Sequence, residues 1–88
     1  MHYHVIFTPF ALKNLKKLDK HDAAMITSWI EKNLEGCSDP RVHGRGLVAN
    51  RSGQWRYRVG DYRIITEIHD DKIVIMVMEI GHRRYIYD

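Results

Sequence analysis

The sequence predicts an α+β fold in which a helix hairpin packs on one face of a mostly antiparallel four-stranded sheet. Residues 2–7 alternate between polar and apolar side chains, as a short strand does. Two segments with helical spacing of apolar residues follow, and three further alternating segments lie in the second half of the chain. The element order is therefore β-α-α-β-β-β, and residues 1–88 are expected to form one domain.

The two expected helices carry local start and stop signals. Thr8 is suited to cap the first helix, with Pro9 at the first helical position. We expect Asp22 to cap the second helix, which runs to about Glu35 and ends at Gly36. The apolar stripes are Ala11, Leu12, Leu15 and Leu18 in the first helix and Ile26, Trp29, Ile30 and Leu34 in the second. The short connection between them predicts an antiparallel hairpin.

A glycine-rich segment, residues 36–54, separates the helices from the last three strands. It holds four of the six glycines and one of the two prolines, a composition typical of exposed loops. Strands are predicted at residues 55–59, 62–68 and about 72–80, with Gly60-Asp61 as the hairpin turn between the first two.

The predicted two-residue turn determines which side chains of the hairpin share a face. It places Arg58 opposite Arg63, and because side chains alternate along a strand, Arg56 joins them on the same face. The other face is apolar and consists of Trp55, Tyr57, Val59, Tyr62, Ile64 and Ile68. Like charges directly opposite each other cost stability, which favours a phosphate-binding role for the three arginines on an open face of the sheet. The alternative is that they extend into solvent or pair with Glu67 and other acids.

Extending the same register through the next turn predicts an irregularity in the last strand. It places Ile68 opposite Ile73 and puts Glu79 on the apolar face. Either this strand contains a bulge or it ends near Met78.

The positive charge is concentrated in the second half of the chain. The net charge is +3; residues 1–40 carry five lysines and five acids, whereas residues 41–88 carry eight arginines and one lysine against six acids. The planar guanidinium group matches phosphate with two parallel hydrogen bonds, so this half is predicted to bind anions. Arg45, in the glycine-rich segment, is a further candidate for phosphate contact.

The closing stretch GHRRYIYD adds candidate site residues. Gly81 is expected to break the last strand and to let the chain carry His82, Arg83 and Arg84 back toward the arginines of the sheet. Adjacent arginines cannot face the same way, so at most one of the two joins that group. Tyr85 and Tyr87 are two residues apart and point to the same side of an extended tail.

Several function classes lack the residues that they require. There is no apolar run of the roughly 18–20 residues that a membrane span needs, and no signal peptide is recognisable. The single Cys37 cannot form an internal disulfide, which fits a reducing cytoplasm, and it lacks an adjacent base. His2 and His4 share a strand face without further ligands, so neither a metal site nor a cofactor is expected.

The stretches WRYRVGDYRII and GHRRYIY, at residues 55–65 and 81–87, resemble the RelE/ParE superfamily of toxins from type II toxin–antitoxin systems. FTPFALKNLKKL near the N-terminus is similar to the first helix of that superfamily, and the resemblance covers essentially the whole chain. It implies a RelE-like fold and, within the RelE branch, a ribosome-dependent endoribonuclease that cleaves mRNA in the A site. It also implies a cognate antitoxin, operator DNA bound through that antitoxin, and the cytoplasm of a bacterium or archaeon.

The resemblance further implies roles for individual residues. Arg63 and Arg83 match catalytic arginines and Tyr87 the C-terminal tyrosine, although the tyrosine spacing is shorter here than in some relatives. Arg56 and Arg58 match basic residues before the hairpin turn, where some members have lysines. The remaining candidates for RNA contact are Arg84, Arg45 and Tyr85.

The expected chemistry is attack of a 2′-hydroxyl on the adjacent phosphate, which gives a 2′,3′-cyclic phosphate without a metal ion. Arginine stays protonated and cannot act as the base, so the proton acceptor is His82, Tyr87 or a ribosomal group. Two other functions are open: a ParE-like inhibitor of DNA gyrase, and a non-catalytic RNA-binding regulatory module. The ParE branch tends to lack this crowding of basic and tyrosyl residues.

Overall fold

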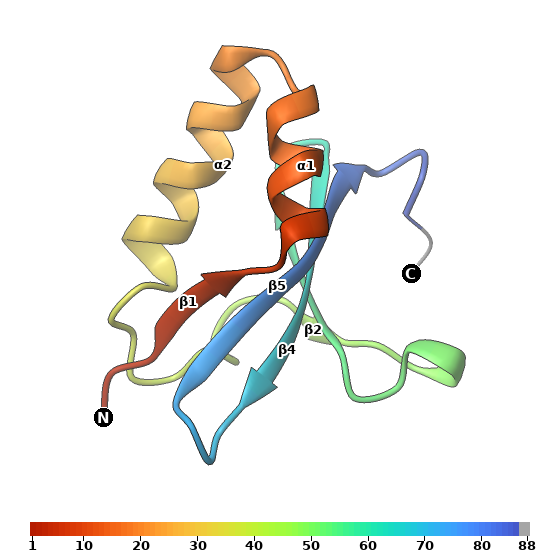
Figure 1. Ribbon diagram of the computed structural model, residues 1–88. Coiled ribbons are helices and arrows are strands. Elements are labelled where there is room, and N and C mark those ends of the chain that lie inside the picture. Colours follow the sequence, from red (N-terminus) through yellow and green to blue (C-terminus); the bar gives the residue numbers. More distant parts are fainter. Residues whose placement is uncertain (87–88) are drawn as a thin grey trace.

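The computed structural model describes residues 1–86, and Figure 1 shows a sheet with two helices together on one side of it. The elements are β1 (His4–Phe7), α1 (Pro9–Lys17), α2 (Lys20–Asn33), β2 (Arg45–Gly46), the 3₁₀ helix η1 (Ala49–Arg51), β3 (Trp55–Val59), β4 (Tyr62–His69) and β5 (Val74–His82). The strand order is β1-β5-β4-β3-β2, with β1 parallel to β5 and the other pairs antiparallel. The predicted α+β class is confirmed.

The sheet of the described residues has five strands, not the expected four. The additional strand, β2, lies in the glycine-rich segment and pairs with β3 over only two residues, Arg45 with Arg56 and Gly46 with Trp55. A two-residue strand has no alternation of its own, so no sequence pattern distinguishes it from a loop.

The first helix begins as predicted, whereas the second begins earlier. The Thr8 hydroxyl accepts a hydrogen bond from the Ala11 N–H at 3.1 Å, with Pro9 in the first turn. The cap of α2 is Asp19, whose carboxylate accepts from the Asp22 N–H at 2.8 Å. The prediction of Asp22 as the cap is therefore wrong. Asp22 lies inside the first turn of α2, where its negative charge interacts favourably with the positive end of the helix dipole.

The helices and the sheet enclose the main core between them. On the helix side, this core contains Ile26 and Ile30 of α2 and Leu34 directly after it. The sheet contributes Tyr57, Val59, Ile64, Ile75, Val77 and Ile80. Trp29 and Leu15 pack against this core while remaining half-buried. Leu12 was expected in the apolar stripe, but it lies on the outer side of α1 and is 43% exposed.

The β3–β4 hairpin has the predicted register. Gly60 takes φ +58° in the turn, and Arg58 lies opposite Arg63 with Tyr57 opposite Ile64. The apolar face of the hairpin packs against the helices, which leaves its arginines on the other side of the sheet.

A β-bulge between Ile65 and Thr66 resolves the conflict over Glu79. The predicted pairing of Ile68 with Ile73 is wrong for a separate reason: the β4–β5 turn is longer than expected, with His69 opposite Val74, so Ile68 pairs with Ile75. Glu79 pairs with Ile65 and so lies on the face away from the helices, where its carboxylate is 3.3 Å from the Arg51 guanidinium.

Gly81 does not break the last strand, contrary to expectation. It lies within β5 opposite Arg63, and the strand continues to His82. The chain turns only afterwards, where the Tyr85 N–H donates to the His82 carbonyl at 2.9 Å. A Cβ atom at Gly81 would lie 3.0 Å from Cδ1 of Ile86, so the glycine lets the returning chain approach the sheet closely.

Candidate nucleic-acid interface

The face of the sheet opposite the helices carries Arg45, Arg56, Arg58 and Arg63, and Arg83 follows β5 at the β3–β4 turn; we call these five residues the arginine cluster. The sequence had led us to expect an open face here, but part of this face is covered. Leu47, before η1, and Ile86, after β5, pack on Ile65 and form a second small core there. Figure 1 shows the η1 loop and the C-terminal segment on the side of the sheet away from the helices.

The arginine cluster has buried and exposed members. Arg56 is 2% exposed and Arg63 is 8% exposed, so the expectation of a solvent-exposed cradle is wrong for these two. Nη1 of Arg63 donates to the carbonyls of Gly60 and Tyr62 at 3.3 and 3.1 Å, which ties this guanidinium to the hairpin turn. Arg58, directly opposite Arg63, is exposed.

Arg45 extends the arginine cluster to the edge of the sheet. The pairing of β2 with β3 places it opposite Arg56, and its side chain is exposed. The sequence named Arg45 as a candidate but assigned it to a loop, so its position beside Arg56 was not predictable.

The closing stretch brings one arginine to the hairpin turn. The Arg83 N–H donates to the Asp61 carbonyl at 2.8 Å, and the Arg83 guanidinium is 3.8 Å from the Asp61 carboxylate. Both of these side chains are more than 60% exposed (63% and 65%), so the ion pair is readily exchanged for a ligand anion. Arg84 and Tyr85 are exposed as well, and Tyr87 lies outside the described residues.

His82 does not lie among the arginines. It pairs with Tyr62 across β4–β5, and the two rings make an edge contact with centroids 5.7 Å apart. Tyr62 is on the helix side, where its hydroxyl donates to Asp22 at 2.6 Å; this hydrogen bond raises the pKa of Tyr62 to about 12. Nδ1 of His82 accepts from the Arg84 N–H at 3.2 Å.

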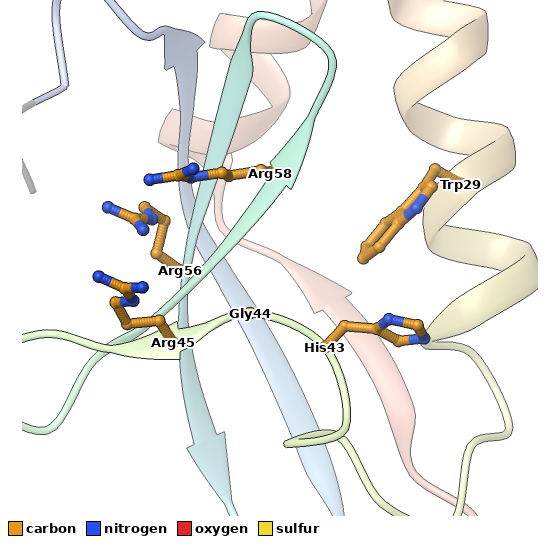
Figure 2. Close-up of a pocket in the computed structure, with 6 residues that line it drawn as sticks. All are labelled: Trp29, His43, Gly44, Arg45, Arg56 and Arg58. Carbon is orange, nitrogen blue, oxygen red and sulfur yellow. The ribbon is translucent and has the colours of Figure 1, made fainter.

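A pocket of about 360 Å³ adjoins the arginine cluster at the β3 edge of the sheet. It is lined by Trp29, His43, Gly44, Arg45, Arg56 and Arg58. Figure 2 shows the rings of Trp29 and His43 on one side and the three guanidinium groups on the other, with Gly44 between them. Sequence reasoning missed Trp29 and His43 as pocket residues, because one fits a helix stripe and the other lies in loop composition.

The segment that carries His43 is anchored on both sides. The Tyr57 hydroxyl donates to the Pro40 carbonyl at 2.6 Å, and Trp55 Nε1 donates to the His43 carbonyl at 2.7 Å. Arg41 binds both carboxylate oxygens of Asp70 at 3.0 Å.

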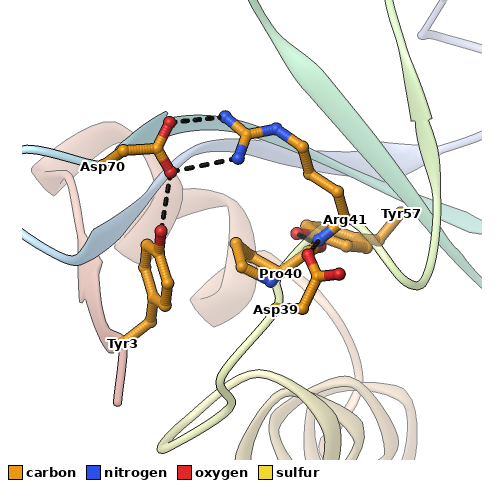
Figure 3. Close-up of polar contacts among 6 residues, drawn as sticks. All are labelled: Tyr3, Asp39, Pro40, Arg41, Tyr57 and Asp70. Carbon is orange, nitrogen blue, oxygen red and sulfur yellow. Dashed lines mark hydrogen bonds and ion pairs between the residues drawn. The ribbon is translucent and has the colours of Figure 1, made fainter. Parts of the chain in front are cut away.

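Asp70 is the junction of this anchor (Figure 3). Besides Arg41 it accepts a hydrogen bond from the Tyr3 hydroxyl at 2.6 Å. The Arg41 guanidinium, and next the Tyr3 hydroxyl, hold the pKa of the Asp70 carboxyl below its usual range. The anchor therefore connects the N-terminus, the β4–β5 turn and the loop before β2.

Two other kinds of site receive no support in the described part of the chain. Within residues 1–86 no group of three or more His, Cys, Asp or Glu side chains is placed to hold a metal ion. Burial raises the pKa of the Cys37 thiol, which disfavours the nucleophilic thiolate.

None of the helices among the described residues is long and apolar enough to cross a membrane.

Comparison with known protein families assigns the chain to one of them. The sequence model of the family described as the ParE toxin of the type II toxin–antitoxin system parDE matches residues 5–87. The chain belongs to this family. It is a toxin of a type II toxin–antitoxin system, and the RelE/ParE resemblance of its sequence is confirmed.

Individual relatives of this toxin carry Rel names. Toxin RelG of Mycobacterium tuberculosis is 29% identical over 87 residues, which cover 99% of this chain and 98% of RelG. The crystal structure of the RelBE2 toxin–antitoxin complex from M. tuberculosis is similar with a TM-score of 0.86 and 26% identity, covering 94% of this chain and 100% of that chain. The isolated Escherichia coli RelE toxin, at 22% identity, shares the fold, with a TM-score of 0.72 over 91% of this chain and 83% of RelE.

Proposed function

We propose that this toxin is a ribosome-dependent endoribonuclease that cleaves mRNA in the ribosomal A site and thereby arrests translation and growth. The observation that carries the proposal is the arginine cluster, which gathers guanidinium groups from β2, β3, β4 and the chain after β5 on one side of the sheet. The register places Arg58 opposite Arg63 and Arg45 opposite Arg56, so four guanidinium groups lie close together on two neighbouring cross-strand pairs.

The cluster suits the charge that develops during RNA cleavage. In the proposed reaction the 2′-oxygen forms a bond to phosphorus while the bond to the 5′-oxygen breaks. The 2′-hydroxyl proton goes to a base, the leaving oxygen takes up a proton, and the products are a 2′,3′-cyclic phosphate and a 5′-hydroxyl. Guanidinium groups held in place before the reaction stabilise the phosphorane charge without a metal ion. Arg63 fits this role because its hydrogen bonds to the turn hold it in position.

The remaining candidates differ in the support that they receive. We propose Arg63 and Arg83 as the main catalytic contacts, with the exposed Arg58, Arg45, Arg84 and Tyr85 holding the RNA. Arg56, which is 2% exposed, adds positive charge to the cluster. His82 lies beside Tyr62 on the helix side, which favours Tyr87 or a ribosomal group as the proton acceptor.

Relatives support a protein partner. Solved structures similar to this chain include the RelBE2 complex of M. tuberculosis and the archaeal RelE–RelB complex of Pyrococcus horikoshii. We propose that a cognate antitoxin binds this toxin in the cytoplasm of a bacterium or archaeon, and that the complex binds operator DNA through the antitoxin.

In vitro translation with the purified protein, followed by primer extension on the mRNA, tests the proposed reaction. The parent should produce breaks at A-site codons, and the Arg63→Ala and Arg83→Ala variants should lose at least about 100-fold of that activity. Lys72→Ala, an exposed residue of the β4–β5 turn, is the control and should cleave like the parent. Full activity of both arginine variants would show that the catalytic assignment is wrong.

Inhibition of DNA gyrase is the second candidate, because the matching family is described as the ParE toxin. Intact mRNA in the translation assay together with loss of gyrase supercoiling would establish this second function in place of the first.

A further inference from the structure

The pocket at the β3 edge combines two chemistries. Trp29 on α2 and His43 before β2 line it with aromatic rings, and Arg45, Arg56 and Arg58 line it from β2 and β3, with their guanidinium groups pointing away from the two rings (Figure 2). Its volume of about 360 Å³ is at the small end of the range for ligand sites. An aromatic surface beside cations suits a nucleotide, whose base has a flat ring and whose phosphate has negative charge.

His43 is presented by a rigid backbone although its side chain is exposed. The hydrogen bond from Trp55 Nε1 fixes its carbonyl, and the Tyr57 hydroxyl fixes Pro40 three residues earlier. Gly44 takes φ +82° and runs so close to β3 that a Cβ atom there would lie 2.3 Å from the Arg56 carbonyl oxygen. A side chain on a segment held in this way loses little further freedom on binding a ligand.

Trp29 supports His43 from the helix side. The two rings meet edge to face with centroids 5.7 Å apart and planes at 68°. Trp29 is itself held by Tyr57, at a centroid distance of 5.6 Å. This arrangement fixes the direction of the His43 ring and leaves that ring exposed at the pocket.

We infer that this pocket binds one unstacked nucleobase of the RNA, stacked on His43 and bordered by Trp29, while Arg45 and Arg58 contact the adjoining phosphates. The identity of the ligand as RNA rests on the proposed function. The RNA strand then crosses the sheet from Arg83 and Arg63 near the hairpin turn to the edge of β3, and His43 positions the nucleotide at that end. Because His43 acts by stacking, another aromatic side chain at position 43 should bind the base as well.

Binding of a short RNA in which every 2′-hydroxyl is methylated tests the inference, because such an RNA cannot be cleaved. Fluorescence anisotropy compares this RNA with versions that lack the base at one position at a time. The parent should bind roughly tenfold more weakly when one particular base is missing. His43→Ala should lose that discrimination, His43→Phe should keep it, and His21→Ala, an exposed histidine at the start of α2, should behave like the parent. Circular dichroism on each variant verifies that it is folded.

The outcomes separate this inference from the proposed function. Base discrimination that depends on the ring at position 43, in a protein that leaves A-site mRNA intact, would support the base site and contradict the proposed reaction. Cleavage of A-site mRNA by a parent that shows no base discrimination would overturn the base site and leave the reaction standing. Equal base discrimination in His43→Ala and the parent would also overturn the base site. Binding that depends on Arg45 but on no base would overturn it as well, because it would identify a phosphate site only.

Discussion

Arg58 and Arg63 lie directly opposite each other across the β3–β4 hairpin, yet one side chain is exposed and the other is 8% exposed. Nη1 of Arg63 bonds to the carbonyls of the turn, whereas the Arg58 side chain lies at the exposed surface and points away from Trp29 and His43 (Figure 2). Two identical side chains in one cross-strand pair thus have different surroundings, one fixed by the fold and one directed to solvent.

Replacing each of these arginines by alanine should separate folding from function. Arg63→Ala removes two hydrogen bonds to the turn from a buried group and should lower the free energy of unfolding by about 1–3 kcal/mol. Arg58→Ala alters an exposed position and should change it by less than about 0.5 kcal/mol. Both should reduce mRNA cleavage, and urea unfolding followed by circular dichroism measures the stability difference. Equal stability of the two variants would contradict the structural role given to Arg63.

The exposed arginines should determine how strongly RNA binding depends on salt. Each phosphate contact with single-stranded RNA releases counterions, so losing one contact should reduce the slope of log K against log salt concentration by about 0.7. Arg45→Ala and Arg58→Ala should each show this reduction, and the double variant about twice as much. Titrations at several salt concentrations measure the slope, with Lys72→Ala as the control that leaves it unchanged. A single variant that lowers affinity at an unchanged slope would show that its arginine does not contact phosphate.

The anchor at Asp70 should make stability depend on acid pH. The pKa of Asp70 is lowered in the folded state by Arg41 and then Tyr3, so its contribution is fully present above the ordinary carboxyl pKa of about 3.9 and is lost as the pH falls through the lowered value. Asp70→Asn should therefore be less stable than the parent at neutral pH, and the difference should shrink below about pH 4. Urea unfolding at a series of pH values measures this. Asp71→Asn, at the exposed next residue, should follow the parent throughout.

Local signals predicted a large part of the fold. Thr8 with Pro9 identifies the start of α1, and the two-residue turn at Gly60 specifies the pairing of Arg58 with Arg63, because both depend on residues close together in the chain. Where two local signals competed, the sequence was less informative. Asp19 and Asp22 are both good caps, and only the structure shows that Asp19 accepts the hydrogen bond.

Contacts between distant residues explain what the sequence did not predict. Leu47 and Ile86 pack on Ile65, on the face of the sheet that carries the buried Arg56 and Arg63, and neither Leu47 nor Ile86 has a sequence pattern that indicates this. The bulge opposite Ile65 and Thr66 confirms one of the two predicted alternatives, because a regular strand would have placed Glu79 on the apolar face; the length of the turn before it was not predicted.

The close approach of Gly44 to β3 allows a sharp test of the loop that carries His43. Gly44 and Gly53 both have positive φ values, +82° and +93°, so alanine at either position incurs the left-handed backbone cost of about 1–2 kcal/mol. Gly53→Ala meets no atom within 4 Å, whereas Gly44→Ala would place its Cβ 2.3 Å from the Arg56 carbonyl oxygen and 2.7 Å from Trp55 Nε1. Gly44→Ala should therefore be the more destabilised variant and should displace β2 from β3, which also breaks the hydrogen bond between Trp55 and His43. Urea unfolding gives the stabilities and tryptophan fluorescence follows the surroundings of Trp55; equal losses in the two variants would show that the loop does not approach the strand this closely.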